Sequence, residues 1–125
     1  MFSHIMLGAN DLEASKRFYD ATLATLGIRP GVFSHDKYFY RSPTGVLAIT
    51  KPIDGKEASP ANGGTIGFAA PSPEAADAFH AAGLAHGGTA IEDPPGERNG
   101  PFGTLNLAYL RDPSGNKVCA LYRVG

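Results

Sequence analysis

The chain lacks the features that mark secreted, membrane-spanning and nucleic-acid-binding proteins. It has one cysteine, Cys119, so no disulfide can form within it and a reducing compartment, the cytoplasm, is expected. Its 11 lysines and arginines are balanced by 12 aspartates and glutamates, which leaves no basic field for a phosphate backbone and argues against a nucleic-acid partner. Near the start, His4 and the run 10–13 interrupt the apolar residues. That stretch is too short and too polar for a signal peptide or a membrane span.

What the sequence does contain is an internal repeat. Shifted by 61 residues, it matches itself without a gap, from Ile5 against Ile66 to Gly27 against Gly88. Farther along, the match continues at a shift of 70. Arg41, Pro43 and Gly45 there correspond to Arg111, Pro113 and Gly115. The shift grows because the second half carries an insertion, placed in the Gly- and Pro-rich run 94–103. Two copies of about 60 residues favour a two-fold duplicated domain over a repeat array.

The first half is predicted to contain one strand, one helix and three further strands. A strand is expected over 2–9, and the run Asn10-Asp-Leu-Glu13 supplies an N-cap and a carboxylate three residues later. Helical spacing of the buried-type residues continues to Gly27, which ends the helix. Three short strands then follow, expected over 28–34, 37–41 and 45–50.

The second half repeats this order. After a strand over 64–70, Ser72 is the expected N-cap and Pro73 the first helical residue of a helix that runs to about His86. Three strands are expected over 88–93, 105–111 and 116–124. The chain is therefore interpreted as a single domain, residues 1–125, with module 1 over 1–53, a linker over 54–63 and module 2 over 64–125.

One helix for four strands covers only one face of each sheet. The bare faces are expected to meet around a shared cavity, with the two halves supplied by one chain or by two. Bare faces and sheet edges also predict a homodimer. Arg41 and Arg111 precede equivalent turns of the repeat, so both are interpreted as structural.

Several residues together resemble one known family. They are His4 in the first strand, Phe18-Tyr19 and Leu26-Gly27 in the helix, and the turn Asp112-Pro113-Ser114-Gly115-Asn116. Over essentially its whole length the chain resembles the vicinal oxygen chelate superfamily, which groups glyoxalase I, bleomycin-resistance proteins and extradiol dioxygenases. The resemblance implies an α+β fold in which two tandem βαβββ modules form a cup-shaped, partly open eight-stranded mixed sheet. This scaffold hosts isomerases, lyases, oxygenases and plain binding proteins, so the fold alone does not define an activity.

The resemblance also implies a divalent metal held in the cup. Its ligand positions map to His4, Thr65 and Cys119, and the repeat at a shift of 70 makes Ile49 the counterpart of Cys119. All four side chains are therefore expected to point into the cup. A catalytic metal generally needs three protein ligands, and a threonine hydroxyl is a poor one. No cofactor is therefore expected. The alternative is a zinc, nickel or iron site with a changed ligand set of His4, Cys119 and Glu92.

Other side chains are candidates for contact with a ligand. Tyr38, Tyr109 and Asn106 lie in strands next to the expected cup, and Arg98 and Phe102 lie in the insertion above it. Cys119 and Glu92 are weak candidates for catalysis, because a buried cysteine is more often a small apolar residue than a nucleophile. His80 and His86 are six residues apart on different helix faces, so a solvent-facing or capping role is expected for both.

Three functions are compatible with this sequence. The first is a protein of the glyoxalase and bleomycin-resistance type that binds a small organic molecule in the cup without a complete metal site. The second is a metal-dependent lyase, isomerase or dioxygenase with a non-standard ligand set. The third is a structural or regulatory dimer without catalysis. No residue selects a particular substrate.

Overall fold

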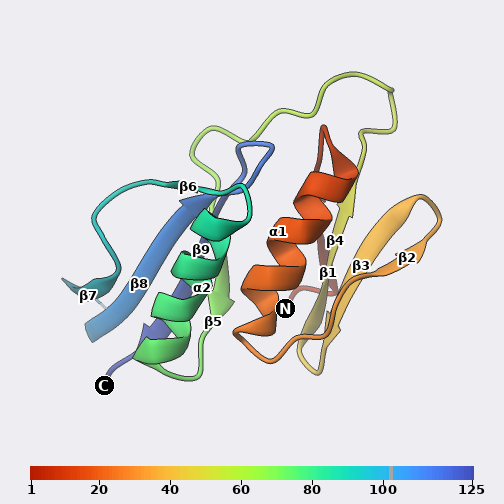
Figure 1. Ribbon diagram of the computed structural model, residues 1–125. Helices are drawn as coiled ribbons and strands as arrows, with labels where there is room; N and C mark the ends of the chain where they lie inside the picture. Colours follow the sequence, from red (N-terminus) through yellow and green to blue (C-terminus); the bar gives the residue numbers. More distant parts are fainter. Residues whose placement is uncertain (102) are drawn as a thin grey trace.

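Each half of the repeat folds into one helix and one small sheet (Figure 1). The structure is a computed structural model that describes residues 1–101 and 103–125. The first half contains β1 (His4–Gly8), α1 (Leu12–Ala24), β2 (Val32–Ser34), β3 (Lys37–Ser42) and β4 (Gly45–Thr50). The second contains β5 (Ile66–Ala69), α2 (Pro73–Ala85), β6 (Thr89–Ala90), β7 (Gly96–Gly100), β8 (Gly103–Arg111) and β9 (Lys117–Arg123).

The strands form two mixed sheets, which confirms the predicted α+β class. The first sheet has the order β1-β4-β3-β2, and the second has the order β5-β9-β8-β6 with β7 also paired to β8. In both, the first strand of the module runs parallel to the last, and the other pairings are antiparallel. The eight strands expected in one sheet are thus divided, since no ladder joins β1 to β5 in the described part of the chain.

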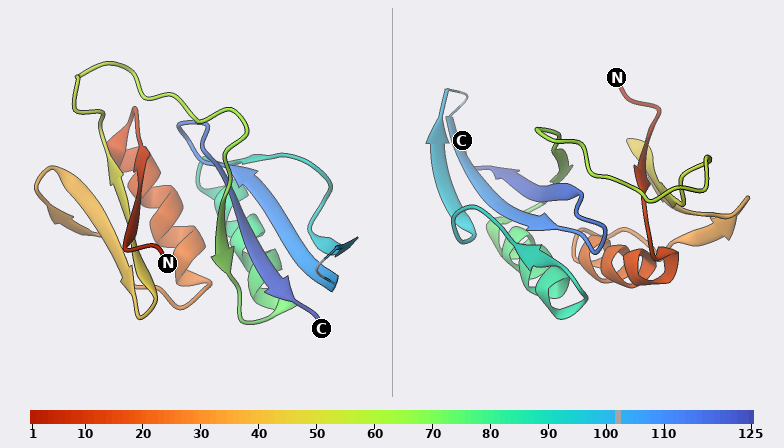
Figure 2. Two further views of the ribbon diagram at one scale, coloured as in Figure 1. Left: turned by 180° about the vertical axis from the view of Figure 1, so that it is seen from behind. Right: turned by 90° about the horizontal axis from the view of Figure 1, so that it is seen from above.

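The two sheets lie side by side with both helices on the same side (Figure 2). The edge strands β1 and β5 flank the gap between the sheets, which we call the seam. The opposite side of each sheet carries no helix, and we call it the open face. This arrangement places the bare faces of the two modules on one side of the molecule, as the repeat predicts.

The insertion in the second half forms a strand, whereas the sequence indicated a loop. Strand β7 pairs with β8 from Gly96 opposite Leu107 to Gly100 opposite Gly103. Gly103 has a φ of 103°, a left-handed conformation that glycine adopts without steric cost and that reverses the chain. The extra strand raises the number in the second sheet to five.

The helix starts follow the capping rules, with one shift from the prediction. Ser72 caps α2 by accepting from the Ala75 amide, and Pro73 is its first residue, as predicted. In α1 the cap is Asp11, which accepts from the Ala14 amide, and not Asn10. The Asn10 side chain instead exchanges two hydrogen bonds with the backbone of Ala58 in the linker, at 2.6 and 3.3 Å.

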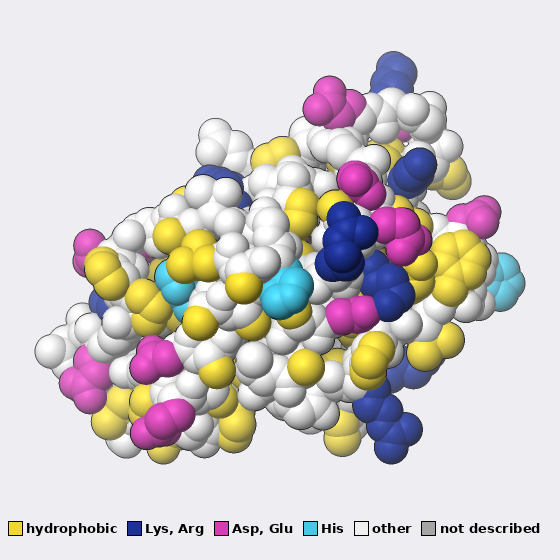
Figure 3. Space-filling view, viewed as in Figure 1, with side chains coloured by type: hydrophobic (Ala, Val, Ile, Leu, Met, Phe, Trp, Pro, Cys, Tyr) yellow, Lys and Arg dark blue, Asp and Glu magenta, His cyan; other side chains and the backbone are white. Residues whose placement is uncertain are grey.

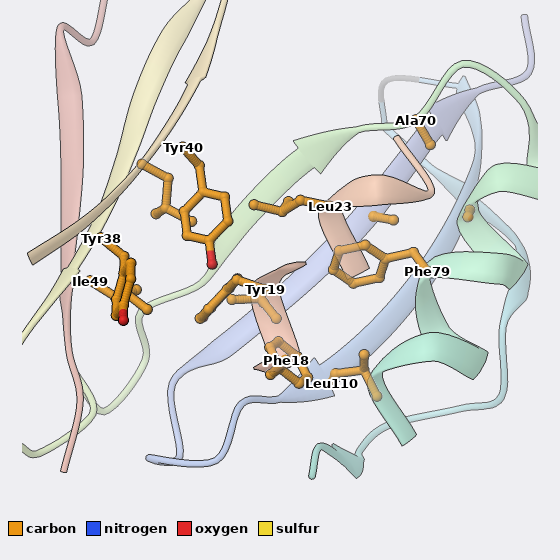
Figure 4. Packing of buried hydrophobic residues seen from close by; sticks show 13 residues of the cluster. Phe18, Tyr19, Leu23, Tyr38, Tyr40, Ile49, Ala70, Phe79 and Leu110 are labelled. Atoms are coloured by element: carbon orange, nitrogen blue, oxygen red, sulfur yellow. The ribbon is translucent and has the colours of Figure 1, made fainter. Parts of the chain in front are cut away.

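The hydrophobic core lies between the helices and the covered faces of both sheets (Figure 4). Phe18, Tyr19 and Leu23 of α1 are its centre, because they contact side chains from both modules. Helix α2 approaches closely at Gly83, where an added Cβ would lie 2.3 Å from Leu110 Cδ1. A single core shared by two modules explains why the helices stay together although their sheets are separate.

A buried polar contact also joins the modules. The Tyr19 hydroxyl donates to Asp112 Oδ2 at 2.7 Å, and Asn116 Nδ2 donates to the Gly8 carbonyl at 2.9 Å. Asp112 also accepts the backbone amides of Ser114 and Asn116 at 2.8 and 3.0 Å. Burial and the neighbouring Asp112 raise the pKa of Tyr19. The Asp-Pro-x-Gly-Asn turn thus fastens the second module to β1 and α1 of the first.

Candidate functional site

Strand alternation decides which residues reach the open face of the first sheet. His4 and Met6 of β1 lie on that face, in register with Val46 and Ala48 of β4. Ile49 lies on the opposite, covered face and is 1% exposed within the core (Figure 4). The prediction that Ile49 points into the cup is therefore wrong.

The correct counterpart of Cys119 is Ala48. Met6 and Gly67 are equivalent at the shift of 61; Met6 pairs with Ala48, and Gly67 pairs with Cys119. The error arose because the turn before β9 is longer than the turn before β4, and a slip of one residue moves a side chain to the other face.

Two further predicted ligand contacts also lie on covered faces. Tyr38 is buried in the core and its hydroxyl donates to Glu13 of α1 at 2.6 Å, a bond that raises the pKa of Tyr38. Asn106 is buried on the covered face of β8, in register with Tyr122. Neither side chain is available to a ligand on the open face.

The open face of the second sheet carries a compact polar group. Cys119 lies in register with Tyr109, and the Lys117 ammonium lies 4.9 Å from the centre of the Tyr109 ring. Lys117 also forms an ion pair with Glu92. Burial raises the pKa of the Cys119 thiol to about 11, so the thiol is protonated at neutral pH. In this cluster the Glu92 carboxylate is engaged by Lys117, and Cys119 is not a thiolate nucleophile.

The donors at the family's ligand positions do not fit a divalent metal. Ala48 has no donor, Thr65 offers only a neutral hydroxyl, and Cys119 is the one sulfur donor. His4 is exposed, and its Nδ1 is 2.8 Å from Ser3 Oγ. Among the described residues no three His, Cys, Asp or Glu side chains lie close enough to share a cation. The alternative set of His4, Cys119 and Glu92 is accordingly not brought together.

Arg98, which was predicted to contact a ligand from the insertion, instead binds the backbone of its own loop. Arg98 is folded back on its own loop and donates to the carbonyls of Asp93, Pro94 and Gly96 at 3.0 to 3.1 Å. It holds the turn that leads into β7. Phe102, the other predicted lid residue, lies outside the described residues.

The two histidines of α2 differ from each other. His86 caps the helix end, with its Nδ1 2.8 Å from the Ala82 carbonyl oxygen, in agreement with the prediction. His80 is buried against β8, where desolvation lowers its pKa. The solvent-facing or capping role expected for His80 is therefore wrong.

A cavity of about 870 Å³ lies at the seam, and we call it the seam cavity. Its apolar floor is formed at the end of α1, and its walls come from β1, β4 and β5. Of the predicted site residues that the structure describes, only His4 lines it, beside two arginines that sequence reasoning missed, Arg29 and Arg41. Arg41 and Arg111 were both interpreted as structural. Arg111 does have a structural contact, since it donates to the Gly115 carbonyl at 2.8 Å, whereas Arg41 lines the cavity.

The fold and the site define a class of α+β proteins with tandem βαβββ modules and a cavity between them. The sequence model of the Glyoxalase/Bleomycin resistance protein/Dioxygenase superfamily matches residues 1–120. The chain belongs to this superfamily.

Solved structures share the fold over the whole chain. A glyoxalase/bleomycin resistance protein from Albidiferax ferrireducens T118 is 65% identical, with a TM-score of 0.97 and coverage of 98% of this chain and 99% of that one. A glyoxalase-related enzyme from Fulvimarina pelagi is 22% identical, with a TM-score of 0.75 and coverage of 98% and 88%. A lactoylglutathione lyase from Agrobacterium tumefaciens is 21% identical, with a TM-score of 0.66 and coverage of 98% and 92%. None of the curated proteins matches the chain.

Neither described helix has the length and apolar character that crossing a membrane requires.

Proposed function

We propose that the protein binds a small organic molecule in the seam cavity without the help of a divalent metal. Two features together carry this proposal. The cavity is large and mainly apolar, and the metal-ligand positions implied by the family lack a complete set of metal-binding side chains. A volume of about 870 Å³ is within the range of small-molecule sites. Thr65 and Cys119 stand at two of the ligand positions that the family resemblance implies, and neither offers the imidazole or carboxylate that a catalytic divalent metal commonly uses.

Metal analysis of the purified protein tests this function. We expect zinc, nickel and iron well below one ion per chain, and an unfolding temperature that EDTA does not change. His4→Ala should leave both results as they are, because His4 is exposed and shares no cation site. One tightly bound ion per chain that is lost in His4→Ala would contradict the proposal and favour the metal-dependent alternative.

The proposal includes a homodimer in the cytoplasm. Val32 and Phe33 of the edge strand β2 are 63% and 56% exposed, and apolar edge strands are normally covered by a partner. The free cysteine, Cys119, suits a reducing compartment. We place the second copy on the β2 edge.

A further inference from the structure

The seam cavity has a lining of one charge sign. The charged side chains that line it are those of Arg29 and Arg41, and no Asp or Glu does so among the described residues. On the helix side of the molecule, by contrast, acidic and basic side chains are intermixed (Figure 3). The excess of positive charge is therefore a local property of the cavity and not of the whole chain, which has a net charge of -1.

The acidic group that approaches the cavity lining is already neutralised. Asp20 of α1 accepts from the hydroxyl of Tyr40, a lining residue, at 2.8 Å. Its other oxygen is 2.5 Å from the Lys16 ammonium, and it also accepts the Gly31 amide at 2.9 Å. Because Lys16 balances Asp20, this carboxylate does not offset the charge of Arg29 or Arg41.

The two arginines have no carboxylate partner in the described part of the chain, where the ion pairs are Lys16–Asp20 and Lys117–Glu92. The Arg41 guanidinium carbon lies 5.3 Å from the centre of the Phe39 ring, and stacking of this kind restrains the side chain. A guanidinium group presents two parallel donors that match a carboxylate. An unpaired arginine at the rim of a cavity is thus a ready anion-binding group.

Below this rim the cavity is apolar. Leu23 at the end of α1, Leu26 and Ile28 just after the helix, and Phe68 of β5 line it. We propose that the seam cavity selects an organic monoanion, whose carboxylate binds Arg29 and Arg41 and whose hydrocarbon body lies on the apolar floor. This inference rests on the proposed function. The cavity would thus discriminate an acid from the neutral amide of the same shape.

Calorimetric titration with 4-phenylbutanoate and its neutral amide, 4-phenylbutanamide, tests this selectivity. We expect the acid to bind about tenfold more tightly, as a charge-assisted pair replaces neutral hydrogen bonds. The double variant Arg29→Gln/Arg41→Gln should lose this preference and bind both compounds equally. The matched control Arg17→Gln/Lys37→Gln removes two positive charges outside the cavity and should keep the preference. Circular dichroism confirms that each variant is folded.

The other outcomes separate two kinds of failure. If acid and amide bind equally to the unaltered protein, or if the control variant loses the preference too, the selectivity is overturned and the cavity remains a ligand site. If neither compound binds at millimolar concentration, the selectivity and the small-molecule function fail together. A Leu26→Trp variant, which fills the floor, should weaken both compounds; unchanged binding would place the ligand elsewhere and overturn the assignment to this cavity.

Discussion

At the scale of single residues, His80 differs from the other three histidines because the fold buries it. Desolvation lowers its pKa from the ordinary 6.5, although Asp77 and a hydrogen bond to the Tyr109 backbone partly oppose this effect. The native state therefore favours the neutral imidazole. In the unfolded chain the same group binds a proton near its ordinary pKa.

His80 should make the protein less stable in mild acid. Below about pH 6.5 the unfolded state binds more protons than the native state, so the free energy of unfolding falls as the pH drops. The slope from this group is at most about 1.4 kcal/mol per pH unit. Urea unfolding at pH 5, 6 and 7 should show a smaller pH dependence for His80→Gln than for the unaltered protein. His86→Gln, at an exposed cap, is the control; an equal loss of slope in both variants would contradict this role.

A single residue also shows how far sequence reasoning reaches. His4 was predicted from the family resemblance, which places a histidine in the first strand, and it lines the seam cavity. Ile49 was wrong since its face depends on turn length, which shifts the register by one residue. Arg29 and Arg41 were missed as a pair because they line the same cavity only once the segment after α1 and strand β3 are placed by the fold. No local pattern encodes that convergence.

At the scale of elements, the packing of α2 on β8 depends on one glycine. An alanine Cβ at position 83 would lie 2.3 Å from Leu110 Cδ1 and 3.1 Å from Phe18 Cε1. Both neighbours are fully buried, so neither can move freely. The succession of elements along the chain and both helices follow from the sequence pattern, whereas this close approach and the extra strand β7 depend on three-dimensional packing.

The Gly83→Ala variant should therefore be less stable despite a better helix former. Alanine favours a helix by about 1 kcal/mol over glycine, but overpacking a filled core typically costs about 1–3 kcal/mol. We expect a net loss in the free energy of unfolding, measured by urea denaturation. Ala81→Gly, on an exposed position of the same helix, measures the propensity contribution alone. A more stable Gly83→Ala protein would show that the helix can shift away from β8.

At the scale of the whole molecule, apolar surface remains uncovered. Phe33 is 56% exposed on an edge strand, where its ring packs edge-on against Tyr38 with 5.2 Å between ring centres. Ile53, which directly precedes the linker, is fully exposed but lies outside any strand. Only the first of these offers unpaired backbone groups beside its side chain, which is the combination that a second sheet edge can bind.

Sedimentation velocity tests the proposed dimer at this edge. The unaltered protein should sediment with twice the mass of one chain. Phe33→Glu should sediment as a monomer because it places a charge in the apolar contact. Ile53→Glu adds the same charge to an equally apolar position and should remain a dimer. A monomeric unaltered protein, or a dimer that survives Phe33→Glu, would exclude this surface.

The turn that joins the modules has a consequence for synthesis. The Tyr19 hydroxyl and the Gly8 carbonyl obtain their partners from Asp112 and Asn116, close to the carboxyl end of the chain. While the ribosome is still making the second half, these groups on the nascent chain have only water to bind. The first module therefore reaches its final form only after translation has passed residue 116. A chain that terminated before this residue would lack the partners of Tyr19 and Gly8.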